Sequence, residues 1–263
     1  MPSHSFNETG YWEDADFHAL NREILDSFGN RLRRIVPLTE KEVSILLKSH
    51  YLGQAAKLLL KKIPQDRPFA IKVPTFSLSI AFWKKVCEEL GVPLGIVIGL
   101  RNPMSVALSA ERCFMDAQEK SFWIWISSML NALVYSEGNQ RILVDYDELI
   151  KNPSHQIERI ATLFQWKLHK ELLHDYTQYF INPKLRHVMV EDHSFSNNEL
   201  CFTLALKMYK KLLPVAIDQG SFEGLKKPLK KWSKKFSSVQ NLLVTLETQE
   251  STIAKLINLH VAL

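Results

Sequence analysis

Short apolar runs alternate with amphipathic stretches along most of this chain of 263 residues. Residues 95–100 are an apolar run of strand length, residues 141–145 are another short predicted strand, and residues 68–73 form a third that Pro74 closes. Apolar side chains at helical spacing predict helices over residues 14–28, 39–62, 79–90, 119–136, 153–164, 196–213 and 239–259, and another beginning at Pro103. This alternation predicts an α/β fold, a short and mainly parallel sheet covered by helices.

Capping residues mark several of the predicted helix starts. Thr39 and Glu42 have the spacing of a capping box. Asn102-Pro103 and Asn152-Pro153 each place a capping side chain before a proline, which is well tolerated at the first helical position. The last two predicted helices have no strand between them. We therefore predict an α/β domain over residues 1–220, followed by a basic linker and a C-terminal helix over residues 221–263.

The composition is that of a globular domain, with 46% apolar and 23% charged residues. No apolar run approaches the roughly 18 residues that a membrane span needs, and the first residues lack the basic and apolar regions of a signal peptide. Cys87, Cys113 and Cys201 have no metal-like spacing. Reduced thiols and a cytoplasmic location are therefore expected.

The positive charge gathers in one segment, KKPLKKWSKK, at residues 226–235. The favoured interpretation is a solvated and partly helical linker. A tail that contacts nucleic acid or an anionic membrane is the alternative. Because Trp232 is the only aromatic residue among the lysines, no nucleic-acid partner is expected.

One stretch, PLGIVIGLRNPMSVALS, indicates a class of ligand. Arg101 follows the apolar run 95–100, and Ser109 lies two turns into the next predicted helix. In open α/β sheets ligands bind at the carboxyl ends of the strands, and an arginine beside a hydroxyl suits a phosphate. The alternatives are a surface arginine paired with a carboxylate and a serine bonded to a helix carbonyl.

Four segments occur in order between residues 7 and 190: NETGYWEDADFHALNREIL, LRNPMSVALS, ILVDYDELIKNPSHQIERIATLF and NPKLRH. Together they resemble the sulfotransferases, in particular the bacterial sulfotransferase-like group of the P-loop nucleotide-binding superfamily. The second segment is similar to that family's motif for the 3′-phosphate of phosphoadenosine phosphosulfate (PAPS). The resemblance therefore implies that Arg101 and Ser109 bind this phosphate.

The resemblance also implies a reaction, transfer of a sulfuryl group from PAPS to a hydroxyl or amine of a small-molecule or carbohydrate acceptor, without a metal. Lys72 is a candidate to stabilise charge on the transferring group. Glu13 and His18 are candidates by position for the general base that the acceptor needs. Arg186 and His187 would close over the nucleotide. Each of these five residues also has a plainer interpretation as a surface, capping or turn residue.

The chain departs from the family in one respect. Family members have a Gly-rich loop whose backbone amides hold the 5′-phosphosulfate, and the nine glycines of this sequence form no such loop. That loop normally precedes the Gly-Tyr-Phe/Trp-Glu stretch, which begins here at Gly10, as if the chain started after its first strand and helix.

Weak or absent transfer activity is the resulting expectation. The alternative is a non-catalytic domain that binds a protein partner through the C-terminal helix. A nucleotide kinase is a third possibility, but a kinase would need the missing phosphate loop and an acidic Mg²⁺ ligand after a strand.

Overall fold

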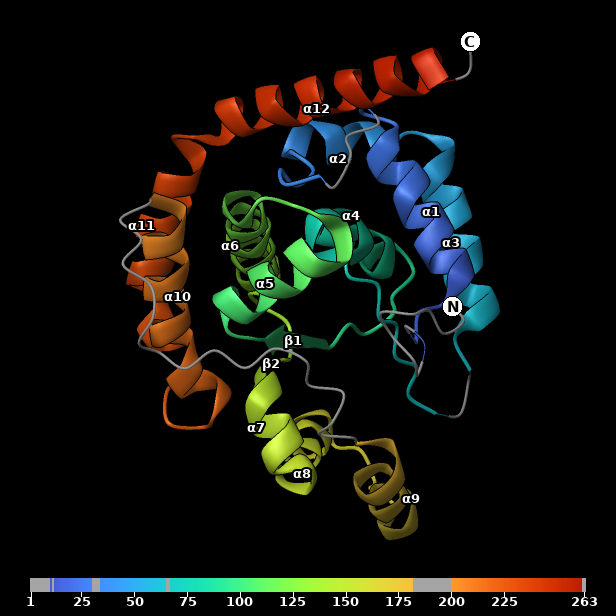
Figure 1. Cartoon of the computed structure of the whole chain (residues 1–263). Helices are drawn as coiled ribbons and strands as arrows, with labels where there is room; N and C mark the ends of the chain where they lie inside the picture. Colours follow the sequence, from blue (N-terminus) through green and yellow to red (C-terminus); the bar gives the residue numbers. More distant parts are fainter. Residues whose placement is uncertain (1–9, 11, 30–33, 65–66, 182–199, 262–263) are drawn as a thin grey trace. The chain divides into compact units, whose positions relative to one another are not determined.

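The computed structural model describes residues 10, 12–29, 34–64, 67–181 and 200–261 (Figure 1). They form two compact units, each built from separate segments of the chain. The first unit takes its described residues from Met1–Pro93, Ser127–Tyr135 and Lys235–Leu263, and the second from Leu94–Ile126 and Ser136–Lys234. The division into domains at residues 1–220 and 221–263 concerns continuous stretches of sequence and stays a prediction.

Among the described residues of the first unit, the regular secondary structure is all helical. Its helices are α1 (Ala15–Asp26), α2 (Glu40–Leu47), α3 (His50–Lys62), α4 (Phe76–Glu89), the second half of α6 (Gln118–Tyr135) and α12 (Gln240–Val261). Aromatic side chains from α1 and α4 form its core, where the ring of Trp83 lies 5.6 Å from that of Phe17 and 5.0 Å from that of Phe76. The buried Asn21 amide oxygen accepts hydrogen bonds from Trp83 Nε1 at 2.8 Å and from Ser79 Oγ at 2.5 Å.

The single helix predicted over residues 39–62 is wrong, because the structure divides it into α2 and α3. Ser49 makes the break: its hydroxyl donates to the Leu46 carbonyl at 2.8 Å and accepts from the Tyr51 amide at 3.2 Å. One side chain thus ends the first helix and caps the second. Serine favours this role because its short hydroxyl reaches nearby backbone groups.

The predicted strand at residues 68–73 is also wrong. This segment has no regular structure, although Val73 is buried. A strand needs a neighbour that accepts and donates its backbone hydrogen bonds. The two paired strands of the described chain both belong to the second unit, and Pro68 and Pro74 offer no amide hydrogen at all. Within residues 68–73 only Val73 is buried, and the run does not become part of a sheet.

The second unit contains a two-stranded parallel sheet, so the broad prediction of parallel strands with flanking helices is confirmed. Strand β1 (Ile96–Leu100) pairs with β2 (Arg141–Asp145), and Leu100 lies opposite Asp145. Helix α10 lies against both strands, and α8 lies against β2. Besides the first half of α6, this unit contains α5 (Pro103–Phe114), α7 (Tyr146–Lys151), α8 (Pro153–Phe164), α9 (Lys170–Asp175), a π-helical turn η1 (Tyr176–Phe180), α10 (Leu200–Ala216), a 3-10 turn η3 (Glu223–Leu225) and α11 (Lys226–Ser237) up to Lys234.

Two of the three predicted caps are confirmed. Thr39 and Glu42 form a capping box at α2, and the Asn102 side chain accepts from the Met104 amide at 2.9 Å. Asn152 gives α8 no side-chain cap, and its amide instead donates to the Glu148 carboxylate. Helix α7, which the pattern did not predict, ends at this point, so the side chain of Asn152 bonds to the helix before it.

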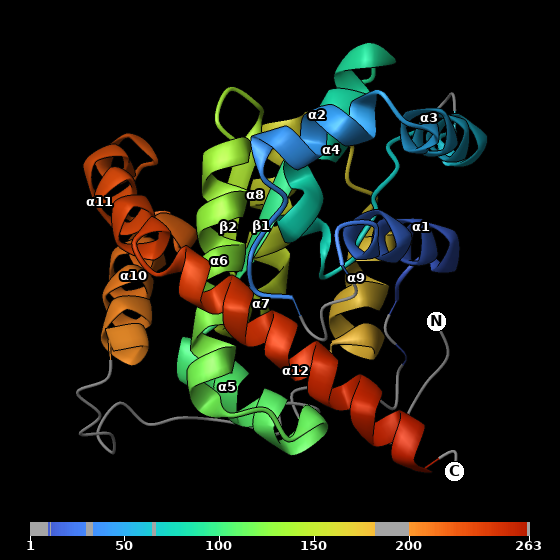
Figure 2. The ribbon, with the colours of Figure 1, turned by 90° about the horizontal axis from the view of Figure 1, so that it is seen from above.

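The lysine-rich segment 226–235 lies within α11, which agrees with the helical and solvated part of the favoured interpretation, while its role as a linker stays a prediction. Within α11, Trp232 is buried while the lysines are exposed. Both views place α11 beside α10 (Figures 1 and 2). The helix predicted over 196–213 is observed as α10, and residues 196–199 lie outside the described residues. None of the described helices is long and apolar enough to cross a membrane.

Candidate functional site

The carboxyl edge of the β1–β2 pair brings together residues that are far apart in the sequence. Because the strands are parallel and Leu100 lies opposite Asp145, the chain leaves the sheet at the same edge in both strands. Arg101 is the first residue after β1, and Tyr146 is the first after β2. The carboxyl ends of parallel strands are the usual place for a ligand in this class of fold.

Arg101 is held at this edge by two contacts. Its guanidinium carbon lies 4.5 Å from the centre of the Tyr146 ring, and its carbonyl oxygen accepts from Trp125 Nε1 at 3.0 Å. A cation over an aromatic ring is stabilised by about 0.5–2 kcal/mol. The sequence did not predict either contact, because both partners lie far from Arg101 along the chain.

The guanidinium of Arg101 has no carboxylate partner among the described residues. Its Nε atom is buried there without a hydrogen-bond partner, and the side chain as a whole is half-buried. A buried donor without an acceptor costs free energy. An anionic ligand with acceptor oxygens would remove that cost, so the arrangement is suited to a phosphate.

Ser109 lies on α5, the helix that Asn102 caps. At 1.5 Å per residue, about 9 Å of helix axis separates Pro103 from Ser109. Arg101 and Ser109 can therefore share a ligand only if that ligand lies along the first two turns of α5. The half-buried environment of Ser109 leaves it open to such a contact.

Asp145 is a residue of this edge that the sequence analysis missed. It is 2% exposed, and its Oδ1 atom accepts from the Glu148 amide at 2.9 Å, as the cap of α7. Its Oδ2 atom is buried without a hydrogen-bond partner in the described structure. Burial raises the pKa of this carboxyl, because the charged form loses its hydration. The signal in the sequence was an acid at the end of a predicted strand, directly after three apolar residues.

The remaining described candidates belong to the first unit. Lys72 Nζ lies 2.8 Å from Glu13 Oε1, and the Glu13 side chain is 4% exposed. His18 is half-buried on α1, and its backbone amide donates a hydrogen bond to the Asp14 carbonyl. The structure thus pairs the candidate base Glu13 with the candidate charge-stabilising residue Lys72, a contact that the sequence did not predict.

The last two candidates, Arg186 and His187, lie outside the described residues. Within the described part of the chain, no cluster of three or more His, Cys, Asp or Glu side chains could hold a metal ion. Cys87, Cys113 and Cys201 are all free cysteines.

Comparison with known proteins finds no matching family model, no matching curated protein and no matching solved structure.

Proposed function

We propose that the second unit binds the 3′-phosphate of a 3′-phosphoadenosine nucleotide at the carboxyl edge of its sheet, and that the chain is a sulfotransferase-like protein. One observation carries the proposal: Arg101 is fixed over Tyr146, with a buried Nε that finds no acceptor among the described residues. A fixed, half-buried cation without a counter-charge among the described residues favours an anionic ligand. The resemblance of the Arg101–Ser109 segment to the sulfotransferase motif suggests that this anion is a 3′-phosphate.

In the proposed reaction, bound PAPS supplies the sulfuryl group, and the protein contributes position and charge. Arg101 and Ser109 would hold the 3′ end of the nucleotide, away from the reacting sulfur. Lys72, Glu13 and His18 belong to the first unit, so their proposed roles in charge stabilisation and proton transfer rest on the sequence resemblance alone. The sequence has no Gly-rich loop for the 5′ end, so transfer by this polypeptide should be weak or absent.

The alternative function is binding of a protein partner without catalysis. Its support is the apolar side of α12, where Leu242, Leu246, Ile253, Leu256 and Ile257 are all exposed. Leu243 and Ser251 of the same helix are buried, so the helix is packed on one side only. Exposed apolar groups at this spacing suit a helical partner.

Calorimetric titration with adenosine 3′,5′-bisphosphate tests the proposal. We expect the wild-type chain to bind, and Arg101→Ala to bind at least about tenfold more weakly, the loss typical of a hydrogen bond to a charged group. Ser109→Ala should lose less, because a hydroxyl contributes a neutral hydrogen bond. The matched control is Arg112→Ala, which removes an exposed arginine from the same helix and should not change the affinity.

Adenosine 5′-monophosphate distinguishes a 3′-phosphate contact from a general effect of charge. This ligand has no 3′-phosphate, so Arg101→Ala should weaken its binding far less. Failure of the wild-type chain to bind the bisphosphate, or equal binding by wild type and Arg101→Ala, would refute the assignment and leave the partner-binding alternative. Robust sulfation of an acceptor would contradict the expected weak transfer.

A further inference from the structure

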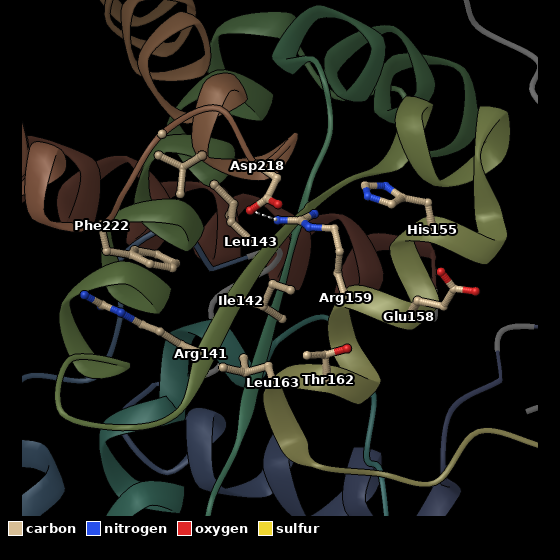
Figure 3. A pocket seen from close by; sticks show the side chains of 12 residues that line it. Arg141, Ile142, Leu143, His155, Glu158, Arg159, Thr162, Leu163, Asp218 and Phe222 are labelled. Atoms are coloured by element: carbon tan, nitrogen blue, oxygen red, sulfur yellow. Dashed lines mark ion pairs between the residues drawn. The ribbon is translucent and has the colours of Figure 1, made fainter.

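The second unit contains an open pocket of about 540 Å³ that the proposed nucleotide site does not use. Its walls are the beginning of β2, one side of α8 and the turn that follows α10 (Figure 3). Arg141, at the first position of β2, lines this pocket, whereas Asp145 ends the strand at the other edge. At 3.3 Å per residue the two positions are about 13 Å apart, so the pocket and the Arg101 edge are separate places.

The pocket has an apolar floor. Leu143 and Val215 are buried at its base, and Leu163 and Phe222 form its sides. The volume lies within the range of pockets for small molecules, which are mostly apolar with a few polar groups that orient the ligand. A ligand with an apolar body is therefore expected, since the removal of apolar surface from water lowers the free energy.

Arg159 is the polar group best placed to orient such a ligand. Its Nη1 atom donates to Gln156 Oε1 at 2.7 Å and to the Ala216 carbonyl at 2.8 Å. Gln156 is fully buried, and the Arg159 side chain is 11% exposed, so the guanidinium is firmly anchored. These are its only hydrogen bonds to described residues. Its remaining N–H groups can donate to a ligand.

Asp218 is the nearest carboxylate to those free donors. Figure 3 shows Arg159 pointing toward it, and Arg159 Nη2 lies 3.7 Å from Asp218 Oδ1, too far for a hydrogen bond. The Asp218 side chain is 69% exposed, so water screens this pair. A ligand carboxylate inside the pocket could form the direct hydrogen bond that Asp218 does not.

The charges around the pocket favour an anion with a single charge. Arg141 lies with its guanidinium 4.2 Å from the centre of the Phe222 ring, and burial lowers its pKa. Glu158 and Asp218, the two acidic lining residues, are exposed. Charges in a less polar environment act more strongly than exposed ones, so the arginines dominate inside. The two carboxylates at the rim would still oppose a second negative charge on the ligand.

We propose that this pocket binds a small organic acid, with its carboxylate on Arg159 and its apolar body against Leu143, Leu163 and Phe222. The proposal does not depend on nucleotide binding at Arg101. The ligand class follows from one anchored arginine with free donors, an apolar floor and a rim that disfavours dianions.

Octanoate is the probe for this proposal, measured by calorimetry on the full chain. We expect saturable binding, and octanol, which lacks the carboxylate, should bind at least about tenfold more weakly. Octyl phosphate, studied at a pH where it is a dianion, should also bind more weakly than octanoate. Tighter binding of octyl phosphate would overturn the choice of a singly charged ligand.

Two variants locate the site. Arg159→Gln should weaken octanoate binding by about tenfold or more, because it removes the charged donor. Thr162→Trp places a bulky ring in the pocket from an exposed lining position, leaves Arg159 in place and should abolish binding. Arg112→Gln, an equal change of charge at an exposed residue outside the pocket, is the control. Octanoate binding that is absent in wild type, or unchanged in Thr162→Trp, would overturn the proposal.

Discussion

Arg101 and Asp145 lie at the same edge of the sheet and have opposite charges, but they do not form an ion pair with each other. Neither residue forms an ion pair with another described residue, and each has a buried polar atom without a partner. The Tyr146 ring supports the arginine, and the amide of Glu148 partly satisfies the aspartate. Burial affects the ionisation of the two side chains differently, because an arginine stays ionised whereas an aspartate can take up a proton. Asp145 therefore gives this edge a dependence on pH.

Substitution of Asp145 should make that dependence visible. Burial raises the pKa of this carboxyl above 3.8, so ionisation is harder in the folded chain than in the unfolded one. Ionisation of Asp145 therefore destabilises the folded chain. This effect is absent below the pKa of the unfolded state, grows as pH rises through the pKa of the folded state and is complete above it. Asp145→Asn, which keeps the cap without the charge, should be more stable than wild type at pH 7. Urea unfolding measured from pH 7 downward should show this advantage shrinking.

Asp145→Ala separates the cap from the charge. It removes both, so it should be about 1 kcal/mol less stable than Asp145→Asn across the same pH range. The explanation fails if wild type is the more stable protein at pH 7, or if the difference between wild type and Asp145→Asn does not change with pH.

Helix ends are decided by single polar side chains in this protein. Ser49 divides one amphipathic stretch into α2 and α3, and Asn152 bonds back to α7 instead of capping α8. At the start of α2, the Glu42 carboxylate accepts from the Thr39 amide at 2.7 Å, and the Thr39 hydroxyl accepts from the Glu42 amide at 3.2 Å. This reciprocal cap involves only neighbours in sequence, which is why the sequence predicts it correctly.

Removal of this cap should destabilise the first unit measurably. Thr39→Ala leaves the Glu42 amide without its side-chain acceptor, and we expect a loss of about 1 kcal/mol in the free energy of unfolding. Thr39→Ser keeps the hydroxyl and should stay close to wild type. Urea unfolding of the three proteins measures both differences, and equal stability of the Ala and Ser variants would show that the cap contributes nothing.

On the scale of the whole molecule, contacts between distant parts of the chain stabilise the first unit. Glu247 on α12 is 1% exposed, and its carboxylate accepts from the backbone amides of Ile35 and Val36, the latter at 2.8 Å. These residues are more than two hundred positions apart. A segment without regular structure thus satisfies its buried amides through the last helix of the chain, as buried donors require.

Loss of this contact should affect the entire first unit. Glu247→Ala would leave two buried amides without their acceptor, at a cost of about 1–3 kcal/mol each. Glu247→Gln keeps one carbonyl oxygen and should lose less. Hydrogen exchange at the Ile35 and Val36 amides should accelerate in the Ala variant, together with the fall in unfolding free energy. Unchanged exchange at both amides would contradict this role for Glu247.

The sequence predicted much of the fold but only part of the site. Both observed strands, the helix that Asn102 caps and the position of Arg101 after β1 follow from local patterns. The Tyr146 ring beneath Arg101 and the ion pair of Lys72 with Glu13 do not, because 45 and 59 residues separate the partners. The failed strand at residues 68–73 has the same origin, since an apolar run does not specify whether a pairing neighbour will be present.

The sequence by itself therefore determined some element boundaries, among them the capped starts of α2 and α5, because capping and periodicity act over a few residues. It also indicated an arginine at a strand end and an anion as its ligand. Only the tertiary structure decided which strands pair, what supports Arg101 and which charges are buried. It alone formed the pocket of Arg159, whose walls come from β2, α8 and the turn after α10. Burial and hydrogen bonding between distant residues depend on the packed chain, and no local pattern contains them.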